Sequence, residues 1–409
     1  MATEAWIIDG VRTPRGKGKS TGALHEVHPQ ELLAQMLNAL VERAGVDRAD
    51  VADVVVGNGN PDGDHANDIA RLAVLAAGWP VAVPGVVLNR FCGSGQQALM
   101  FAATGIAAGW QDLVVAGGVE SMSRYPAGVT TPTSAGNDAL LERYPLVPQG
   151  ISADLIASVE GFGREEVDGF AVRSQQRAAA AVAADAFARS IVPARAPDGS
   201  VLLDHDEHPR AGTTLDSLGS LNPAFARAGE KVREPSGRSY DEDCLSCYPQ
   251  VDAVNHVHHA GNSSGVVDGA SAILLSSPDY ARAHGLTPRA RVVTGAVAGA
   301  DPVIMLTAPG PASEAALAKA GLSVGDIDLW EINEAFAAVP LKVIRDLKID
   351  EDRVNVNGGA IALGHPIGAT GPILFQTVLD ELERRDLSTA LVTMCTGGGM
   401  GTATIIERV

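Results

Sequence analysis

Short apolar runs rich in β-branched residues alternate with longer amphipathic segments over the first 125 residues of the chain. The short runs predict strands, at Ala5–Ile8, Val51–Val56, Val86–Leu88 and Leu113–Ala116. The longer segments predict helices, at about His28–Ala44, Asp68–Ala77 and Gln96–Ala108. Alternation of this kind predicts an α/β fold with a largely parallel or mixed sheet.

The alternation stops between about Arg124 and Gly265. Pro, Gly and Ser are frequent there, and the pattern predicts one helix, at about Arg164–Arg189, among loops. A compact domain seldom keeps so much irregular chain without a use for it. We therefore expect an inserted loop lobe that shapes a binding site.

The α/β pattern then returns as an internal repeat. The segment Ala44–Val56 is similar to Ala320–Ile332, and the same offset aligns Cys92–Gly95 with Gly368–Gly371. Leu113–Gly118 is similar to the run that begins at Leu391. The repeat predicts two α/β halves, each a mixed sheet covered by helices, with the active site between them. We expect an N-terminal half of residues 1–123 and 266–288, a lobe of residues 124–265, and a C-terminal half of residues 289–409.

Composition narrows the class of protein. A chain of 409 residues with 46% apolar and 20% charged residues is typical of a globular protein of two or three domains. Four cysteines are too few for a disulfide framework, so we expect a reducing, cytoplasmic compartment. The first apolar residues predict a strand and not a signal peptide, and no apolar run is long enough to span a membrane. A net charge of −18 disfavours nucleic acid or an anionic membrane as the main partner, but it permits a phosphate-bearing small molecule.

Cys92 lies at the turn between the predicted strand Val86–Leu88 and the helix that follows. Unpaired N–H groups and the helix dipole at such a position favour an anion, so we expect a lowered thiol pKa and a nucleophile. The alternative is a buried structural cysteine, which is the commoner role of a single Cys.

Three further stretches in the second half carry candidate chemistry. Glu331–Phe336 follows a predicted strand, Asn355–Gly368 holds His365 in a glycine-rich loop, and Met394–Gly401 places Cys395 before a run of glycines. An imidazole can take the proton of a thiol, and Asn, His and glycine N–H groups can face an oxyanion. A second thiol, with an ordinary pKa of about 8.5, is a suitable acid or base for carbon acids.

Taken together, these motifs resemble those of the thiolase family over essentially the whole chain. Cys92 lies in Asn-Arg-Phe-Cys-Gly-Ser-Gly, and residues 118–123 match the family's Gly-x-Glu-x-Met-Ser run. Asn333 begins Asn-Glu-Ala-Phe, His365 lies in Gly-His-Pro, and Cys395 precedes Gly397 in Cys-x-Gly-Gly-Gly.

The resemblance implies a role for each of these residues. Cys92 would be the acylated nucleophile, activated by His365. Asn333 would hold a water in one oxyanion hole together with His365, and Gly397 N–H would form a second oxyanion hole with that of Cys92. Cys395 would be the acid/base.

The resemblance also implies two residues that contact coenzyme A, and it implies the reaction that is catalysed. Ser264 falls on a serine that contacts pantetheine, and Arg210 on an arginine near the nucleotide of CoA. The implied activity is a ping-pong acyl transfer: thiolytic cleavage of a 3-ketoacyl-CoA, as in β-oxidation of fatty acids, or the reverse Claisen condensation. CoA is then a substrate, no metal or redox cofactor is required, and a homodimer or homotetramer is expected.

The sequence departs from the family in the lobe. Gln149-Gly150 stands where many relatives carry Met-Gly, and the connection from Phe225 to Ala260 is far longer than in short-chain enzymes. Both differences concern the expected acyl pocket, so the acyl preference is left open.

Three alternatives are weighed against the thiolase interpretation. The first is a decarboxylating ketoacyl synthase of the same fold. Such enzymes typically pair the cysteine with two histidines, whereas this chain has Cys395 in a Cys-x-Gly-Gly-Gly run, which disfavours this class of enzyme. A non-catalytic acyl-CoA or sterol-carrier binding protein would be expected to have lost catalytic residues. Cys244, Cys247 and the nearby His256, His258 and His259 could instead form a zinc site, although their spacing is unusual for one.

Overall fold

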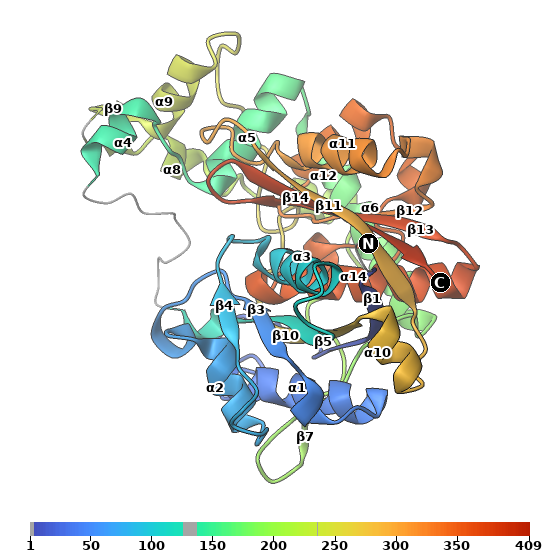
Figure 1. The fold of residues 1–409 in the computed structure, drawn as a ribbon. Helices are drawn as coiled ribbons and strands as arrows, with labels where there is room; N and C mark the ends of the chain where they lie inside the picture. Colours follow the sequence, from blue (N-terminus) through green and yellow to red (C-terminus); the bar gives the residue numbers. More distant parts are fainter. Residues whose placement is uncertain (1–3, 126–136, 235) are drawn as a thin grey trace.

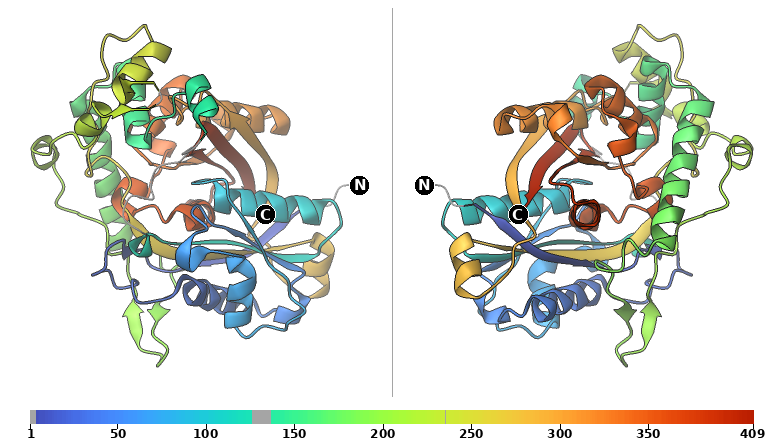
Figure 2. Two further views of the ribbon diagram at one scale, coloured as in Figure 1. Left: turned by 90° about the vertical axis from the view of Figure 1, so that its left-hand side faces the viewer. Right: turned by 90° about the vertical axis from the view of Figure 1, so that its right-hand side faces the viewer.

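The computed structural model describes residues 4–125, 137–234 and 236–409. Figures 1 and 2 show helices and sheet in layers, with α3 (Ser94–Ala107) and α14 (Ile367–Arg385) in the central layer. On one side lie α1 (Pro29–Ala44), α2 (Ile69–Ala76) and α10 (Pro278–Ala283). On the other side lie α11 (Pro309–Ala320) and α12 (Ala338–Leu347).

A continuous mixed sheet runs between these helical layers. In the N-terminal half it contains β1 (Trp6–Arg12), β3 (Asp53–Gly57), β4 (Val86–Leu88), β5 (Leu113–Ser121) and β10 (Val267–Ser276), with the short β2 (Gly16–Lys17) beside β10. In the C-terminal half it contains β11 (Ala290–Gly299), β12 (Leu329–Ile332), β13 (Thr389–Thr396) and β14 (Met400–Arg408).

The strand order is symmetric about the junction of the two halves. It runs β12-β13-β14-β11-β1-β10-β5-β3-β4, and the halves meet where Trp6 pairs with Arg291 and Ile7 with Ala290. In both halves a parallel pair, β3 with β5 or β12 with β13, is followed by an antiparallel neighbour. The duplication predicted from the repeat is therefore confirmed.

The repeat also has the same local geometry in both copies. Helices α1 and α11 each end at a glycine with φ 68°, Gly45 and Gly321, and a short 3-10 turn and a strand follow in each case. A left-handed residue after a helix favours glycine because a Cβ would clash there. The shared helix stop accounts for the Ala-Gly pair that stands at the same place in both segments.

The two central helices cross at very short range. A Cβ on Gly95 would lie 2.3 Å from Gly368 O, and a Cβ on Gly371 would lie 2.1 Å from Gln96 N, so only glycine fits. Each helix also binds the other half's sheet. Gln96 Nε2 donates to Val392 O at 2.9 Å, and Gln376 Nε2 donates to Val11 O at 3.0 Å.

Most predicted elements of the halves are confirmed within a few residues. The lobe differs, because it contains more helix than expected: α4 (Asp138–Arg143), α5 (Gln149–Glu160), α6 (Arg164–Ala183), α7 (Leu215–Gly219), α8 (Ala226–Gly229) and α9 (Tyr240–Cys247). It also contains the hairpins β6 (Ala194–Arg195) with β7 (Val201–Leu203), and β8 (Val232–Arg233) with β9 (Arg238–Ser239). The prediction of a single helix was wrong because short helices are stabilised by packing more than by a visible periodicity. Residues 126–136 of the predicted lobe lie outside the described part.

Helix α6 also ends earlier than the predicted Arg189. It stops at Ala183, and Asp185 then adopts φ 56°, a conformation that no helix can continue through. The chain turns there, and Ser190 O accepts a hydrogen bond from Arg12 N at 2.8 Å, which brings the lobe back to β1.

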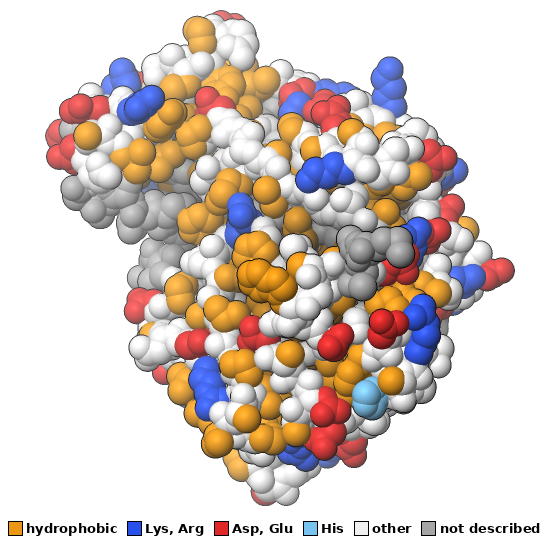
Figure 3. All heavy atoms as spheres, viewed as in Figure 1, with side chains coloured by type: hydrophobic (Ala, Val, Ile, Leu, Met, Phe, Trp, Pro, Cys, Tyr) orange, Lys and Arg blue, Asp and Glu red, His pale blue; other side chains and the backbone are white. Residues whose placement is uncertain are grey.

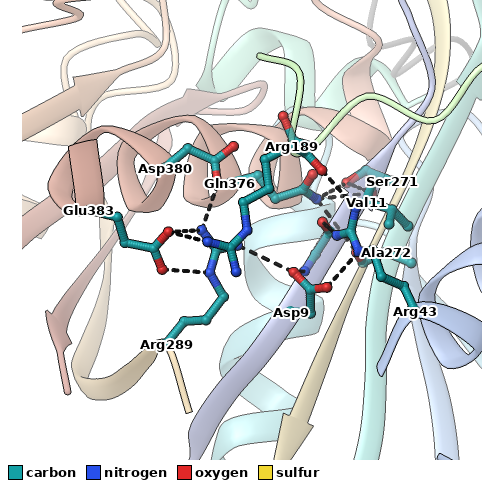
Figure 4. Close-up of polar contacts among 12 residues, drawn as sticks. Asp9, Val11, Arg43, Arg189, Ser271, Ala272, Arg289, Gln376, Asp380 and Glu383 are labelled. Atoms are coloured by element: carbon teal, nitrogen blue, oxygen red, sulfur yellow. Dashed lines mark hydrogen bonds and ion pairs between the residues drawn. The ribbon is translucent and has the colours of Figure 1, made fainter. Parts of the chain in front are cut away.

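An ionic network ties the lobe to both halves (Figure 4). Arg289 bonds Asp380 at 2.6 Å and Glu383 at 2.7 Å and lies 3.4 Å from Asp9. Arg43 bonds Asp9 at 2.6 Å, and Arg189 of the lobe bonds Glu383 at 2.5 Å. Because Arg289 is almost fully buried, its charge requires these carboxylates.

Within the described residues, no helix has the length and apolar character that a membrane span needs.

Candidate active site

The turn that carries Cys92 joins β4 to α3. Phe91 has φ 49°, a left-handed conformation that is uncommon outside glycine. Two hydrogen bonds hold it: Arg90 N–H donates to Ser94 Oγ at 2.8 Å, and the Ser94 hydroxyl donates to Phe91 O at 2.6 Å. The result is a fixed Cys92, 6% exposed, directly before the first turn of α3.

Burial decides the protonation state of this thiol. We expected the helix start to lower the pKa, and this prediction was wrong: loss of solvent raises the pKa of Cys92 to about 12. Hydrogen bonds from the backbone N–H groups of Cys92 and Gly397 favour the thiolate, but they do not outweigh desolvation, and the nearby Glu120 opposes them. At rest Cys92 is therefore a neutral thiol, which would need a base to act as a nucleophile.

His365 is an imidazole with a defined tautomer. Its Nδ1 lies 2.6 Å from Thr370 Oγ1, and the Thr370 hydroxyl donates to Pro366 O at 2.9 Å. Because that hydroxyl has only one hydrogen, Nδ1 of His365 must be the donor and Nε2 must carry the lone pair. Burial, and then the charge of Arg15, lower the pKa of His365 to about 3, so the imidazole is neutral.

Asn333 lies next to that lone pair. It follows β12, and its Nδ2 is 3.4 Å from His365 Nε2. Its Oδ1 is buried and has no hydrogen-bond partner among the described residues. The residue before it, Ile332, is held by the side chain of Asn355, which accepts from Ile332 N and donates to Ile332 O, both at 2.8 Å. A buried amide with an unused oxygen beside an imidazole is well placed to hold a water.

Cys395 and Gly397 come from the end of β13. Cys395 is fully buried, and burial, followed by the proximity of Cys92, raises its pKa well above the ordinary value. Gly398 and Gly399 turn the chain with φ 76° and 77°, which directs Gly397 N–H at the Cys92 sulfur. The structure therefore brings Cys92, Cys395 and Gly397 together.

The two CoA candidates lie in different surroundings. Ser264 is partly buried, and its N–H donates to Ala335 O at 2.9 Å, while the next residue, Gly265, accepts from His365 N at 2.9 Å. This loop is therefore part of the same site. Arg210 is exposed, and only its backbone is held, through a 2.8 Å bond to Gln175; its guanidinium has no partner among the described residues.

A buried carboxylate that we had assigned no role lies under the site. Glu120 accepts from Gly59 N at 2.8 Å, from Gly368 N at 2.7 Å and from Asn58 Nδ2 at 3.0 Å, and it also bonds the Tyr125 hydroxyl. Burial raises the pKa of Glu120 to about 7. It fixes the start of α14 against the N-terminal half. The Gly-Val-Glu-Ser run, which matches a motif of the family, could have indicated Glu120 from the sequence. The contacts of Glu120 could not be predicted, because its hydrogen-bond donors Gly59 and Gly368 are distant in the chain.

The residues of the alternative zinc site are engaged elsewhere. His256 bonds Asp154 at 2.7 Å and Asp241 at 3.0 Å, His258 bonds Asp154 at 2.7 Å, and His259 bonds Asp168 at 2.9 Å. Across residues 4–125, 137–234 and 236–409, no three His, Cys, Asp or Glu side chains gather in a way that could hold a metal ion.

Comparison with known families decides the assignment. Residues 5–232 match the thiolase N-terminal domain, and residues 286–408 match the thiolase C-terminal domain. The chain belongs to the thiolase family. It is therefore an acyl-CoA C-acyltransferase, which cleaves 3-ketoacyl-CoA thiolytically or catalyses the reverse condensation.

Similar thiolases match along their whole length. A beta-ketoadipyl-CoA thiolase of Pseudomonas aeruginosa is 41% identical, with 100% of both chains covered. A steroid 3-ketoacyl-CoA thiolase of Mycobacterium tuberculosis is 41% identical over 100% of this chain and 95% of its own. The crystal structure of the Bacillus anthracis acetyl-CoA acetyltransferase superposes with a TM-score of 0.84 at 37% identity, covering 100% of this thiolase and 99% of that chain.

Proposed function

We propose that Cys92 carries the acyl group and that His365 takes its proton. The tautomer of His365 carries this proposal, because Thr370 fixes Nδ1 as the donor and leaves the lone pair on Nε2, which Asn333 Nδ2 approaches only to 3.4 Å. His365 lies two residues before α14, whose Gly368 packs against Gly95 of α3, three residues after Cys92. An accepting nitrogen and a neutral thiol at the starts of two crossing helices form a suitable nucleophile and base.

The cleavage step follows from these groups. The Cys92 proton passes to His365 Nε2 as the sulfur attacks the 3-keto carbon, and the N–H groups of Cys92 and Gly397 face the oxyanion. The bond between C2 and C3 breaks, and the neutral Cys395 thiol protonates C2 of the departing acetyl-CoA enolate. The enolate oxygen is stabilised by protonated His365 and by a water on Asn333. A second CoA then takes the acyl group from Cys92.

Coenzyme A is in this proposal a substrate, and neither a metal nor a redox cofactor is required, because the thioester itself acidifies C2. Ser264 would contact pantetheine, since its loop adjoins both Asn333 and His365. Arg210 would lie near the nucleotide, since its guanidinium is exposed and free of partners among the described residues. An accessible guanidinium can bind a phosphate locally even though the chain has a net charge of −18.

The acyl group is proposed to be longer than acetoacetyl. Relatives of about the same sequence identity carry names that state different acyl groups. The percentage identity therefore does not select one acyl group for this chain. The long connection after Phe225 is folded into α8, β8, β9 and α9, and Phe225 itself packs on Gly150, next to Gln149. This extra wall beside the nucleophile supports a reshaped pocket.

A homodimer or homotetramer is also proposed. Figure 3 shows hydrophobic side chains gathered over α3 on one face, where Phe101 is 54% exposed. Strand β4 ends the sheet, and Val86 on it is 43% exposed. An apolar face beside an open sheet edge favours a second copy.

A cytoplasmic location is also proposed, because Cys92, Cys244, Cys247 and Cys395 are all free thiols.

A trapping experiment tests the nucleophile directly. The enzyme is exposed briefly to labelled acetyl-CoA, quenched in acid and digested, and the acetyl group is located by peptide mapping. We expect it on Cys92, because that sulfur alone faces both N–H donors. Label on Cys395, Cys244 or Cys247 would overturn the assignment, while steady cleavage of acetoacetyl-CoA by CoA, followed at the enolate absorbance, controls for an active preparation.

A further inference from the structure

A side-chain amide lies beside the nucleophile in addition to the backbone donors. Gln149 is the first residue of α5, and its side chain lies near enough to the Cys92 sulfur to favour the thiolate. Its Nε2 is also 3.4 Å from the point that a Cβ on Gly397 would occupy, so it adjoins the glycine whose N–H faces the same sulfur. The carboxamide and Gly397 N–H thus approach Cys92 from neighbouring positions.

The amide is held in place by the packing of α5. A Cβ on Gly150 would meet the ring of Phe225 at 2.3 Å, so the first turn of α5 lies tightly under that ring. Ser152, one turn on, donates to Val303 O at 2.8 Å. Phe225 in turn meets Phe336 edge to face, with ring centroids 5.9 Å apart. A donor on so well fixed a helix start needs little reorganisation to meet a developing charge.

Gln149 differs from a methionine at this position in one chemical respect. The two side chains are similar in length, but a thioether has no hydrogen to donate, whereas Nε2 of Gln149 has two. A neutral thiol in a desolvated site gains little from a donor, while a thiolate gains much more. Any donor here therefore acts mainly when Cys92 loses its proton.

We propose that Gln149 is a further catalytic residue, whose carboxamide donates a hydrogen bond to the Cys92 thiolate and thereby increases its population. The inference rests on the proposed role of Cys92 as nucleophile. It concerns the free enzyme, so it can be measured without substrate turnover.

The test is the rate of Cys92 alkylation by iodoacetamide as a function of pH. A Cys247→Ser background removes the exposed cysteine, and peptide mapping counts label at Cys92 alone. In Gln149→Met we expect alkylation at pH 7.5 to be roughly three- to tenfold slower, which corresponds to a thiolate pKa raised by about half to one unit. Because the pKa of Cys92 lies near 12, the ratio of the two rates should stay constant from pH 7.5 to 10. A second thiolate-specific reagent, methyl methanethiosulfonate, should show the same ratio as iodoacetamide, since a lost donor affects the thiolate population and not access to the sulfur.

Two further variants sharpen the result. Gln149→Glu replaces the donor by a negative charge and should slow alkylation at pH 7.5 more than Gln149→Met does. Gln176→Met makes the same change at an exposed position of α6 and should leave the rate unchanged, with thermal unfolding of each variant as a folding control.

The outcomes separate this inference from the proposed function. Equal rates at pH 7.5 for the parent and Gln149→Met, or a difference seen with iodoacetamide and not with methyl methanethiosulfonate, would overturn the role of Gln149 and leave Cys92 as nucleophile. Failure of labelled acetyl-CoA to modify Cys92 would instead overturn the proposed function.

Discussion

At the scale of single residues, burial controls the chemistry of this site more than charge does. Cys92 and Cys395 both have a raised pKa and His365 a lowered one, and loss of solvent is the first cause in each case. All three groups are therefore neutral at rest. A neutral pair of thiols beside a neutral imidazole can pass a proton in either direction, which suits a reaction that runs both as cleavage and as condensation.

The two cysteines should be separable by substitution. Cys395→Ala removes the acid/base but leaves the nucleophile, so it should still accept an acetyl group from acetyl-CoA while carbon–carbon cleavage falls by roughly a hundredfold or more. Cys92→Ala should lose both. The measurement pairs acid-quench labelling with the steady-state cleavage rate, and near-normal cleavage by Cys395→Ala would contradict this division of roles.

At the scale of elements, the site depends on segments that hold one another. Helices α3 and α14 can cross closely only because glycines stand at the contact, and Glu120 fixes the start of α14. The lobe is held by a buried polar contact of its own: Asp154 on α5 bonds His256 and His258 at 2.7 Å each and so ties α5 to the loop that leads to Ser264. This contact links the stability of the lobe to pH.

His256 is the group that titrates in that contact. Burial alone would lower its pKa, but hydrogen bonds to Asp154 and Asp241 outweigh burial and raise the pKa to about 9. Because this value exceeds the ordinary 6.5, the stabilisation is fully present below about pH 6.5 and is lost as pH rises through about 9.

The matching variant is His256→Asn, which cannot take the charge. The parent should be more stable than the variant by on the order of 2 kcal/mol at pH 6, since one pKa unit is about 1.4 kcal/mol and solvent screens part of it. The difference should shrink steadily towards pH 10. Denaturant unfolding at a series of pH values measures it, and a difference that does not vary with pH would refute the charged contact.

At the scale of the whole molecule, two similar halves present their strand ends and helix starts to a common centre. Cys92 comes from the first half, whereas His365, Asn333 and Cys395 come from the second half, and the lobe lies along one side of both (Figure 2). The candidate catalytic residues thus belong to the halves, while Gln149 and the long connection after Phe225 belong to the lobe.

The length of the acyl group is predicted at this scale. If the connection from Phe225 to Ala260 reshapes the pocket as proposed, thiolysis efficiency should rise from the four-carbon to the eight-carbon 3-ketoacyl-CoA. Each buried methylene could add up to about 0.8 kcal/mol, or roughly fourfold. The comparison of kcat/KM across the series tests this, and a steady fall with length would show that the added chain serves another purpose, such as subunit contact.

The sequence by itself determined the α/β class, the duplication and the residues of the thiolase motifs. These are local properties: strand and helix periodicity, the Gly45 and Gly321 stops, and short runs around Cys92, Asn333, His365 and Cys395. It did not determine the helices of the lobe, the raised pKa of Cys92, or the contacts of Gln149 and Glu120. Each of these depends on which distant segments surround a group and exclude water from it, and only the tertiary structure decides that.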